Sequence, residues 1–282
     1  MSDLIIKKAK LKHYELGYVE YGEENSQGLI IMPAIISRIR NWNFIAEFMG
    51  QKFHSVLFDL PGHGESKLIS AYNRELFGKS MIEFADYLGF ERVSLMGFSF
   101  GGMLVMTSLK YLKDRVDNVI LLAPVLDKDV ISIEKTKRKL AVEIIRFLGY
   151  KPTMTLVSSF VSSKIGSKVL SKLVAKFIKL DHPEMFRKSL RNIEKSALES
   201  LAVQCKEVMA LEEFRDVKYQ HRCFYAVSKQ DPMIDPEKSK KLAESIFENI
   251  YIDYLDMPYH QPKEPYTLEF ANEKFGHLLD LV

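Results

Sequence analysis

The sequence is poor in cysteine: Cys205 and Cys223 are the only two in 282 residues. Two cysteines without a recognisable spacing exclude a small disulfide-stabilised scaffold, and they favour reduced core residues of a cytosolic protein over a single disulfide. No apolar run approaches the ~20 residues that a membrane-spanning helix needs, and the N-terminal residues 1–16 lack the apolar core of a secretory signal. We therefore expect a cytoplasmic protein without a transmembrane segment.

The sequence also lacks any cluster of His, Cys, Asp or Glu at metal-ligand spacing, any internal repeat and any low-complexity segment. We therefore expect no metal site and no cofactor, and nothing in the pattern indicates an oligomeric state. The composition, 47% apolar and 27% charged, is typical of a soluble globular protein. A chain of this length can bury the core of one α/β domain that carries an insertion.

The most informative stretch lies in residues 93–106, where an apolar run is followed by a helical apolar pattern. The pattern Gly97-x-Ser99-x-Gly101 lies between the two. This is the signature of a nucleophile elbow, a sharp strand-to-helix turn that presents a serine hydroxyl above a sheet. The glycines are needed because the turn leaves almost no room for a Cβ atom. The pattern alone is weak evidence, but the strand and helix around it make it specific.

Strand-like and helix-like segments alternate along the rest of the chain. Buried strands are predicted at residues 29–32, 55–59, 93–96 and 116–125, and helices at residues 41–53, 79–88, 197–214 and 266–281. An opening strand or hairpin is predicted at residues 11–21. This alternation predicts an α/β fold with a mostly parallel, doubly wound sheet that helices cover on both faces.

Four blocks, in this order, give the chain a resemblance to the α/β-hydrolase superfamily outside its middle. They are Asp59-Leu60-Pro61-Gly62-His63-Gly64-Glu65-Ser66, Gly97-Phe98-Ser99-Phe100-Gly101-Gly102, the strand and turn of residues 224–232, and Met257-Pro258-Tyr259-His260. The resemblance implies the superfamily's fold with a serine nucleophile, an inserted helical cap and a catalytic triad in the order Ser, Asp, His.

By this resemblance we assign Ser99 as nucleophile, His260 as general base and Asp231 as the acid that orients the histidine. Serine is a poor nucleophile unless a base removes its proton, and a carboxylate holds that base in one tautomer. Other residues compete for these roles. They are Asp235, which also fits a helix N-cap before Pro236, Asp127 after an earlier strand, His277 in the last helix, and His63 in the glycine loop.

One departure from the superfamily concerns the oxyanion hole. The superfamily usually has His-Gly after its third strand, where this sequence has Pro33-Ala34. The backbone N–H groups of Ile35 and Phe100 are the predicted oxyanion donors, and a backbone donor needs no particular side chain. Proline has no N–H and alanine is less permissive than glycine, so we expect a reshaped hole.

The middle of the chain is longer than this fold requires. We predict a first part of the core at residues 1–126, a helical cap at 127–195 and a second part of the core at 196–282. Residues 128–195 contain sixteen Lys/Arg and six Asp/Glu, a net charge of +10, so with +3 for the whole chain the rest carries −7. Leu156, Val157, Phe160 and Val161 are predicted to contribute to a pocket for an apolar group.

Lysines and apolar residues alternate at helical spacing in residues 163–180. The apolar stripe comprises Ile165, Val169, Leu173 and Phe177, and the lysine row beside it comprises Lys164, Lys168, Lys172 and Lys176. One interpretation is an amphipathic cap helix with a solvated lysine face. The other is a surface for an anionic partner: an acidic carrier protein, a coenzyme A thioester or an anionic membrane. Nucleic acid is not expected, because no nucleic-acid-binding motif accompanies the charge.

The sequence therefore predicts a serine hydrolase that cleaves a small-molecule or acyl-chain ester or thioester, including an anionic one, through an acyl-enzyme. Carbon–carbon bond hydrolases and perhydrolases use the same triad and remain alternatives, because one fold hosts many chemistries. A second class is a non-catalytic ligand-binding or signalling protein. The presence of Pro33-Ala34 in place of His-Gly leaves this alternative open.

Overall fold

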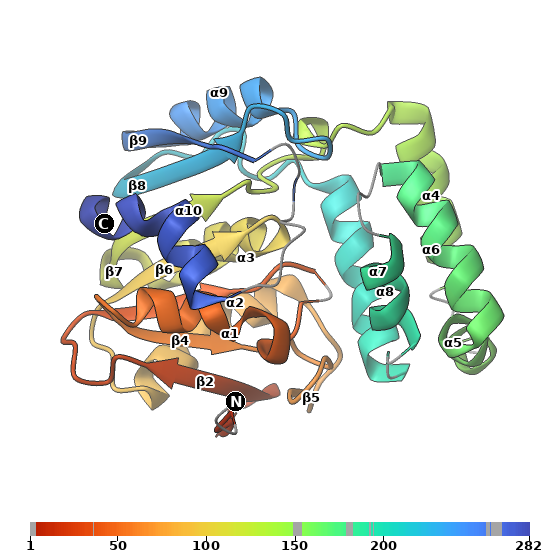
Figure 1. Ribbon diagram of the computed structural model, residues 1–282, viewed down its shortest axis with the longest axis horizontal. Coiled ribbons are helices and arrows are strands. Elements are labelled where there is room, and N and C mark those ends of the chain that lie inside the picture. The colour runs from red at the N-terminus through yellow and green to blue at the C-terminus, as the bar shows by residue number, and fades with distance from the viewer. Residues whose placement is uncertain are drawn as a thin grey trace.

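The computed structural model describes residues 4–35, 37–148, 154–178, 183–191, 193, 195–257, 260 and 267–282. Its strands are β1 (Lys7–Lys10), β2 (Tyr14–Tyr21), β3 (Gly28–Met32), β4 (His54–Phe58), β5 (Lys67–Leu68), β6 (Val93–Phe98), β7 (Val116–Leu122), β8 (Tyr219–Ser228) and β9 (Phe247–Leu255). They form one sheet in the order β1-β2-β4-β3-β6-β7-β8-β9, and β5 pairs with β2 (Figure 1). The pairs that include β2 are antiparallel and the others are parallel. The predicted mostly parallel α/β fold is confirmed.

Helices cover both faces of this sheet. The α-helices of the described residues are α1 (Ile39–Met49), α2 (Arg74–Tyr87), α3 (Phe100–Leu112), α4 (Lys135–Leu148), α5 (Met154–Ser162), α6 (Lys164–Ile178), α7 (Pro183–Arg191), α8 (Lys195–Ala210), α9 (Pro236–Ile246) and α10 (Leu268–Leu281). The buried residues of α2, α3 and α9 belong to one core cluster, and those of α1 and α10 to the other. Among the described residues, no helix is both long enough and apolar enough to cross a membrane.

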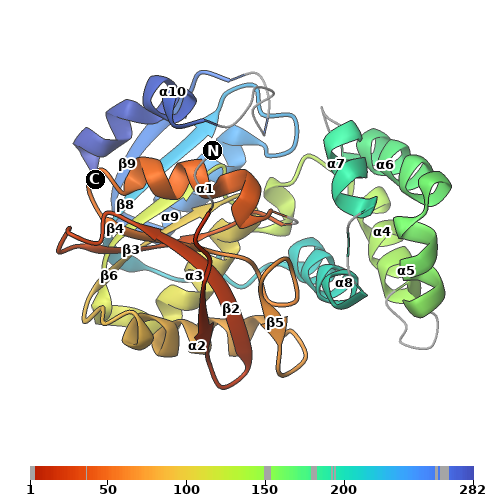
Figure 2. The same ribbon diagram turned by 60° about the horizontal axis from the view of Figure 1, so that its bottom comes forward.

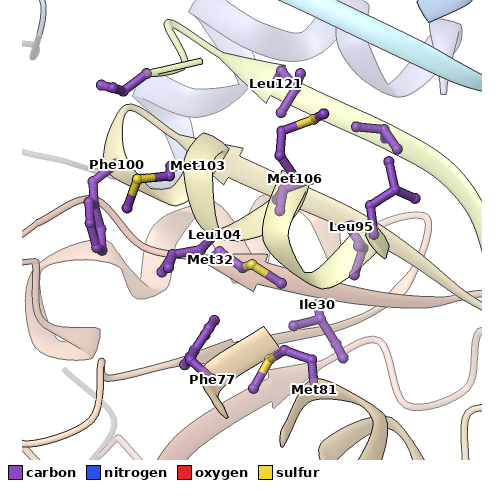
Figure 3. Packing of buried hydrophobic residues seen from close by; sticks show 14 of the residues in the cluster. Ile30, Met32, Phe77, Met81, Leu95, Phe100, Met103, Leu104, Met106 and Leu121 are labelled. Carbon is purple, nitrogen blue, oxygen red and sulfur yellow. The ribbon is translucent and has the colours of Figure 1, made fainter. Parts of the chain in front are cut away.

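The strand β3 shows why both faces are covered. All five of its residues are buried. Because successive strand side chains point to opposite faces, Ile30 and Met32 join the cluster under α2 and α3, whereas Leu29 and Ile31 join the cluster under α1 and α10. Figure 3 shows the first of these clusters, in which Met103, Leu104 and Met106 of α3 pack over the strands. A continuous apolar run is what a strand needs when it is buried on both faces.

The helices α4 to α7, here called the inserted helices, lie between β7 and α8 in the chain and to one side of the sheet (Figures 1 and 2). Both views place α5 and α6 farther from the sheet than α8. Residues of α5, α7 and α8 share a small apolar cluster of their own, which includes Val161, Leu190 and Leu201. The predicted boundaries at residues 127 and 195, and the role of this segment as a cap, stay predictions.

The prediction of an apolar pocket lined by four residues of α5 is wrong for two of them. Val161 is buried and Val157 is partly buried, but Leu156 and Phe160 are exposed. Leu156 and Phe160 lie at the solvent-facing edge of this helical face, so they line no pocket inside the protein.

Candidate active site

The turn between β6 and α3 has the geometry of a nucleophile elbow. Ser99 is its single residue outside both elements, and its φ of 53° lies in the left-handed region that residues other than glycine rarely adopt. Three backbone hydrogen bonds hold it there. Its N–H donates to Leu122 O at 2.9 Å, and its carbonyl accepts from the N–H groups of Gly102 at 3.0 Å and Val125 at 2.9 Å. The surrounding backbone therefore stabilises the strain at Ser99.

The two flanking glycines are required by close backbone approach. A Cβ atom on Gly97 would overlap the carbonyl oxygen of Gly101, and one on Gly101 would overlap the carbonyl oxygen of Met32 at the end of β3. Both obstacles are backbone atoms, which cannot move aside as a flexible side chain can. The sequence pattern Gly-x-Ser-x-Gly is thus a consequence of how tightly β6, α3 and the end of β3 pack.

We expect Gly101→Ala to destabilise the protein by roughly 2 kcal/mol or more, because its new Cβ overlaps backbone. The matched control is Gly276→Ala in α10, where a Cβ would meet nothing within 4 Å. That variant should be neutral or stabilised by up to ~1 kcal/mol, since alanine is the better helix former. Denaturant unfolding of both variants measures the difference. Equal stability of the two would show that the elbow is not tightly packed.

The structure brings together the three side chains that the sequence assigned to the triad. His260 Nε2 lies 2.8 Å from Ser99 Oγ, and His260 Nδ1 lies 2.7 Å from Asp231 Oδ2. All three residues are buried. A carboxylate only accepts hydrogen bonds, so Nδ1 carries the proton and the Ser99 hydroxyl donates to Nε2. The second oxygen of Asp231 accepts from the N–H groups of Met233 at 2.8 Å and Ile234 at 2.9 Å, which fixes the carboxylate.

Two aromatic residues that the sequence analysis did not single out orient the histidine ring. The rings of Phe98 and His260 lie 5.2 Å apart at 31°, and those of Trp42 and Phe98 lie 5.2 Å apart at 33°. Phe98 occupies the first variable position of the Gly-x-Ser-x-Gly pattern, which is the only signal in the sequence that could have identified it. The stack Trp42–Phe98–His260 restricts rotation of the imidazole away from Ser99.

The loop that carries His260 is tied to the end of β8. The Ser228 hydroxyl donates to the carbonyl of Met257 and accepts from the Gln230 N–H at 3.0 Å. One buried serine thus joins the strand that leads to Asp231 with the segment that leads to His260. Pro258 and Tyr259, which the sequence analysis placed in the histidine loop, lie outside the described residues.

The competing acids are engaged elsewhere. Asp127 accepts two hydrogen bonds from Arg215, at 2.6 and 2.8 Å. Asp235 caps α9, accepting from the Lys238 N–H at 3.1 Å, with Pro236 at the first helical position as predicted. Neither carboxylate therefore orients His260.

The two competing histidines, His277 and His63, have other surroundings than the Ser99 hydroxyl. His277 pairs with Asp253 at the surface. His63 is buried in the glycine loop, and burial lowers its pKa to about 3, with nearby Arg38 acting in the same direction. His63 is therefore neutral near pH 7 and cannot donate a proton as an imidazolium there. Within the described part of the chain, no group of three His, Cys, Asp or Glu could hold a metal ion.

The predicted oxyanion donors flank the elbow. Phe100 is the first residue of α3, and Ile35 follows β3, whose Met32 pairs in register with Gly97. Among the described residues, neither N–H has a hydrogen-bond acceptor. A small apolar cavity of about 20 Å³ lies next to this loop, and Pro33, Ala34, Trp42 and Phe98 are among its lining residues. Unpaired N–H groups at a helix start favour negative charge.

Comparisons with known proteins agree with this architecture. A family model described as alpha/beta hydrolase fold matches residues 29–145. The acetyltransferase component of the acetoin cleaving system of Pseudomonas putida, described as a dihydrolipoyllysine-residue acetyltransferase, is 25% identical over 118 residues, which are 42% of this chain and 32% of that protein. The chain thus matches about a third of the length of this curated relative.

Solved structures match nearly the whole chain. One, described as novel epoxide hydrolases of the alpha/beta hydrolases superfamily in metagenomes from hot environments, has a TM-score of 0.70 at 16% identity and covers 99% of this chain and 96% of its own. A thermophilic esterase from Thermogutta terrifontis has a TM-score of 0.66 at 15% identity and covers 88% of this chain and 90% of its own. At these identities, the likeness concerns the fold.

Proposed function

Because a family model described as alpha/beta hydrolase fold matches residues 29–145 and solved structures share the fold of nearly the whole chain, we propose that the protein is a serine hydrolase that cleaves a carboxylic ester or thioester through an acyl-enzyme. The observation that carries this proposal is the hydrogen-bonded row of Ser99, His260 and Asp231. The hydrolases and esterases among its structural neighbours support hydrolase chemistry. The choice of an ester bond rests on the serine nucleophile and its buried base.

The row can perform both halves of the reaction. In the first, Ser99 Oγ attacks the acyl carbon while His260 Nε2 takes the hydroxyl proton, and His260 then gives that proton to the leaving alcohol or thiol. In the second, His260 takes a proton from the water that attacks the acyl-enzyme, and it gives that proton to Ser99 Oγ as the acid is released. Asp231 keeps the proton on Nδ1 and stabilises the imidazolium in each half.

The oxyanion of each tetrahedral intermediate is assigned to the N–H groups of Ile35 and Phe100. The first lies in the Pro33-Ala34 loop and the second begins α3. Neither donor depends on its side chain, so the replacement of His-Gly by Pro33-Ala34 is compatible with catalysis.

We expect a fluorophosphonate probe to label the wild-type protein at Ser99, because an activated serine in a row with a buried histidine attacks phosphorus as it attacks an acyl carbon. A series of p-nitrophenyl esters and acyl thioesters of increasing chain length then identifies the substrate class. Absence of both labelling and turnover would favour the non-catalytic class. Labelling without hydrolysis of any ester or thioester would favour the carbon–carbon bond hydrolases or perhydrolases.

A further inference from the structure

The helix α6 is packed with its apolar stripe outward. Ile165 is 73% exposed, Val169 44% and Leu173 61%. On the side away from the stripe, Ser167 and Ser171 are buried, and Leu170 is partly buried against the apolar cluster that includes Val161 and Leu190. A helix on a protein surface ordinarily packs its apolar residues against the core and exposes its polar ones, whereas α6 leaves these three large apolar side chains exposed. The side chain of Phe177, the fourth residue of the stripe, is outside the described part.

Close packing explains which side of α6 faces inward. A Cβ atom on Gly166 would overlap the carbonyl oxygen of Phe160 in α5, so only glycine allows the two helices to meet there. Ser167 accommodates its hydroxyl by donating to the Ser163 carbonyl at 2.7 Å. The small residues therefore let α6 pack closely on its neighbours, and Ile165, Val169 and Leu173 are left facing solvent.

The apolar exposure extends beyond α6. Within the described part of the chain, six of the eleven exposed large apolar side chains belong to the inserted helices. They are Leu140 of α4, Leu156 and Phe160 of α5, and Ile165, Val169 and Leu173 of α6. Scattered apolar residues on a surface need no explanation, but a concentration on neighbouring helices marks an interaction site. Figures 1 and 2 show α5 and α6 at the end of the molecule away from the sheet.

The outer face, by which we mean the side of α5 and α6 directed away from the sheet, belongs to a segment whose charged residues are all positive. Residues 144–180 contain seven Lys/Arg and no Asp/Glu. Lys164, Lys168, Lys172 and Lys176 are exposed on α6 beside the apolar stripe. Among the described residues, none of the four has a carboxylate within salt-bridge distance. The rest of the protein outside residues 128–195 has a net charge of −7, so the positive charge is local to this segment.

We propose that the outer face of α5 and α6 docks onto the surface of an anionic phospholipid bilayer. An interfacial helix places apolar side chains at the boundary of headgroups and acyl chains while its lysines contact anionic headgroups, and α6 presents both along one side. The lysine stems reach past the apolar side chains to the headgroup layer. This interaction is additional to the proposed hydrolase activity and does not depend on it.

A bilayer fits the face better than a second copy of the chain does. In a symmetric contact between two copies, the same face meets itself. The lysine row of one α6 would then approach the lysine row of the other, which is repulsive. An anionic bilayer instead has negative headgroups directly above an apolar layer. The headgroups can meet the lysine row of α6 while the apolar layer meets its apolar stripe.

The test uses the full-length protein, sedimented with vesicles of phosphatidylcholine alone and of phosphatidylcholine mixed with phosphatidylglycerol. One variant changes Ile165, Val169 and Leu173 to serine, and a second changes Lys164, Lys168, Lys172 and Lys176 to glutamine. All seven side chains are exposed, so both variants should melt near the wild-type temperature. A charge-matched control changes Lys79, Lys218, Lys238 and Lys241, which are exposed outside the inserted helices, to glutamine.

We expect wild type and control to bind the mixed vesicles, and each α6 variant to bind them at least about 10-fold more weakly, since each lysine near an anionic surface contributes several-fold to affinity. Raising the salt concentration should weaken wild-type binding and have little effect on the lysine variant. Equal binding by wild type and both α6 variants, or no binding by wild type, would overturn the proposal. Wild-type dimers that the serine variant abolishes, without vesicle binding, would assign the face to a second copy instead.

Discussion

Replacing Ser99 with alanine is expected to lower turnover of any ester that the wild-type protein hydrolyses by about 10⁴- to 10⁶-fold, the usual effect of losing a residue of a catalytic triad. The Ser99 hydroxyl is the group hydrogen-bonded to His260, and it makes no side-chain bond to the start of α3. Its removal therefore deletes the proposed nucleophile without deleting a helix cap. The kcat/KM of the purified variant and its melting temperature measure the two effects separately.

The matched control for Ser99→Ala is Ser108→Ala. Ser108 is also buried and lies in α3, but its hydroxyl donates to the carbonyl of Leu104 at 2.8 Å, within the helix. This variant should keep both turnover and probe labelling. If Ser99→Ala retained more than about a tenth of wild-type turnover, the assignment of Ser99 as nucleophile would be wrong.

Changing Asp231 to asparagine should lower turnover by about 10⁴-fold while the fold is kept. The asparagine oxygen can still accept from the N–H groups of Met233 and Ile234, so the turn is preserved. Its amide group, however, can donate to Nδ1 of His260, which favours the tautomer that carries its proton on Nε2. That tautomer cannot accept the proton of Ser99. Comparison of kcat/KM with the wild type measures the loss.

Asp235→Asn is the control for this substitution, because it makes the same chemical change four residues away. Asparagine caps a helix about as well as aspartate does, so α9 should keep its first turn and turnover should change by no more than about 2-fold. A larger loss of kcat/KM in Asp235→Asn than in Asp231→Asn would contradict the geometry and move the acid to Asp235.

The sequence by itself determined the fold and the local geometry around the candidate nucleophile. Apolar runs predicted the strands, and their alternation with helix-like segments predicted the covering helices. A strand that is buried on both faces of a parallel sheet needs apolar residues along nearly its whole length, so the sequence shows it directly. The elbow is equally local: Gly97 and Gly101 are dictated by clashes within the turn and with the neighbouring strand. The N-cap at Asp235 was also predictable, because its partner Lys238 lies three residues away. The strand β9 was not predicted; its residues alternate between buried and exposed positions only weakly.

Only the tertiary structure decided which acid faces the histidine and which side of α6 faces solvent. Ser99 and His260 are separated by 161 residues, and the three candidate aspartates differ little in local pattern, so their partners depend on long-range packing. For α6, periodicity shows that two sides differ but not which one is buried. The inward side is the one on which Leu170 meets the cluster of α5, α7 and α8, and the close approach of α5 at Gly166 accompanies it; both are long-range contacts that only the assembled helices reveal.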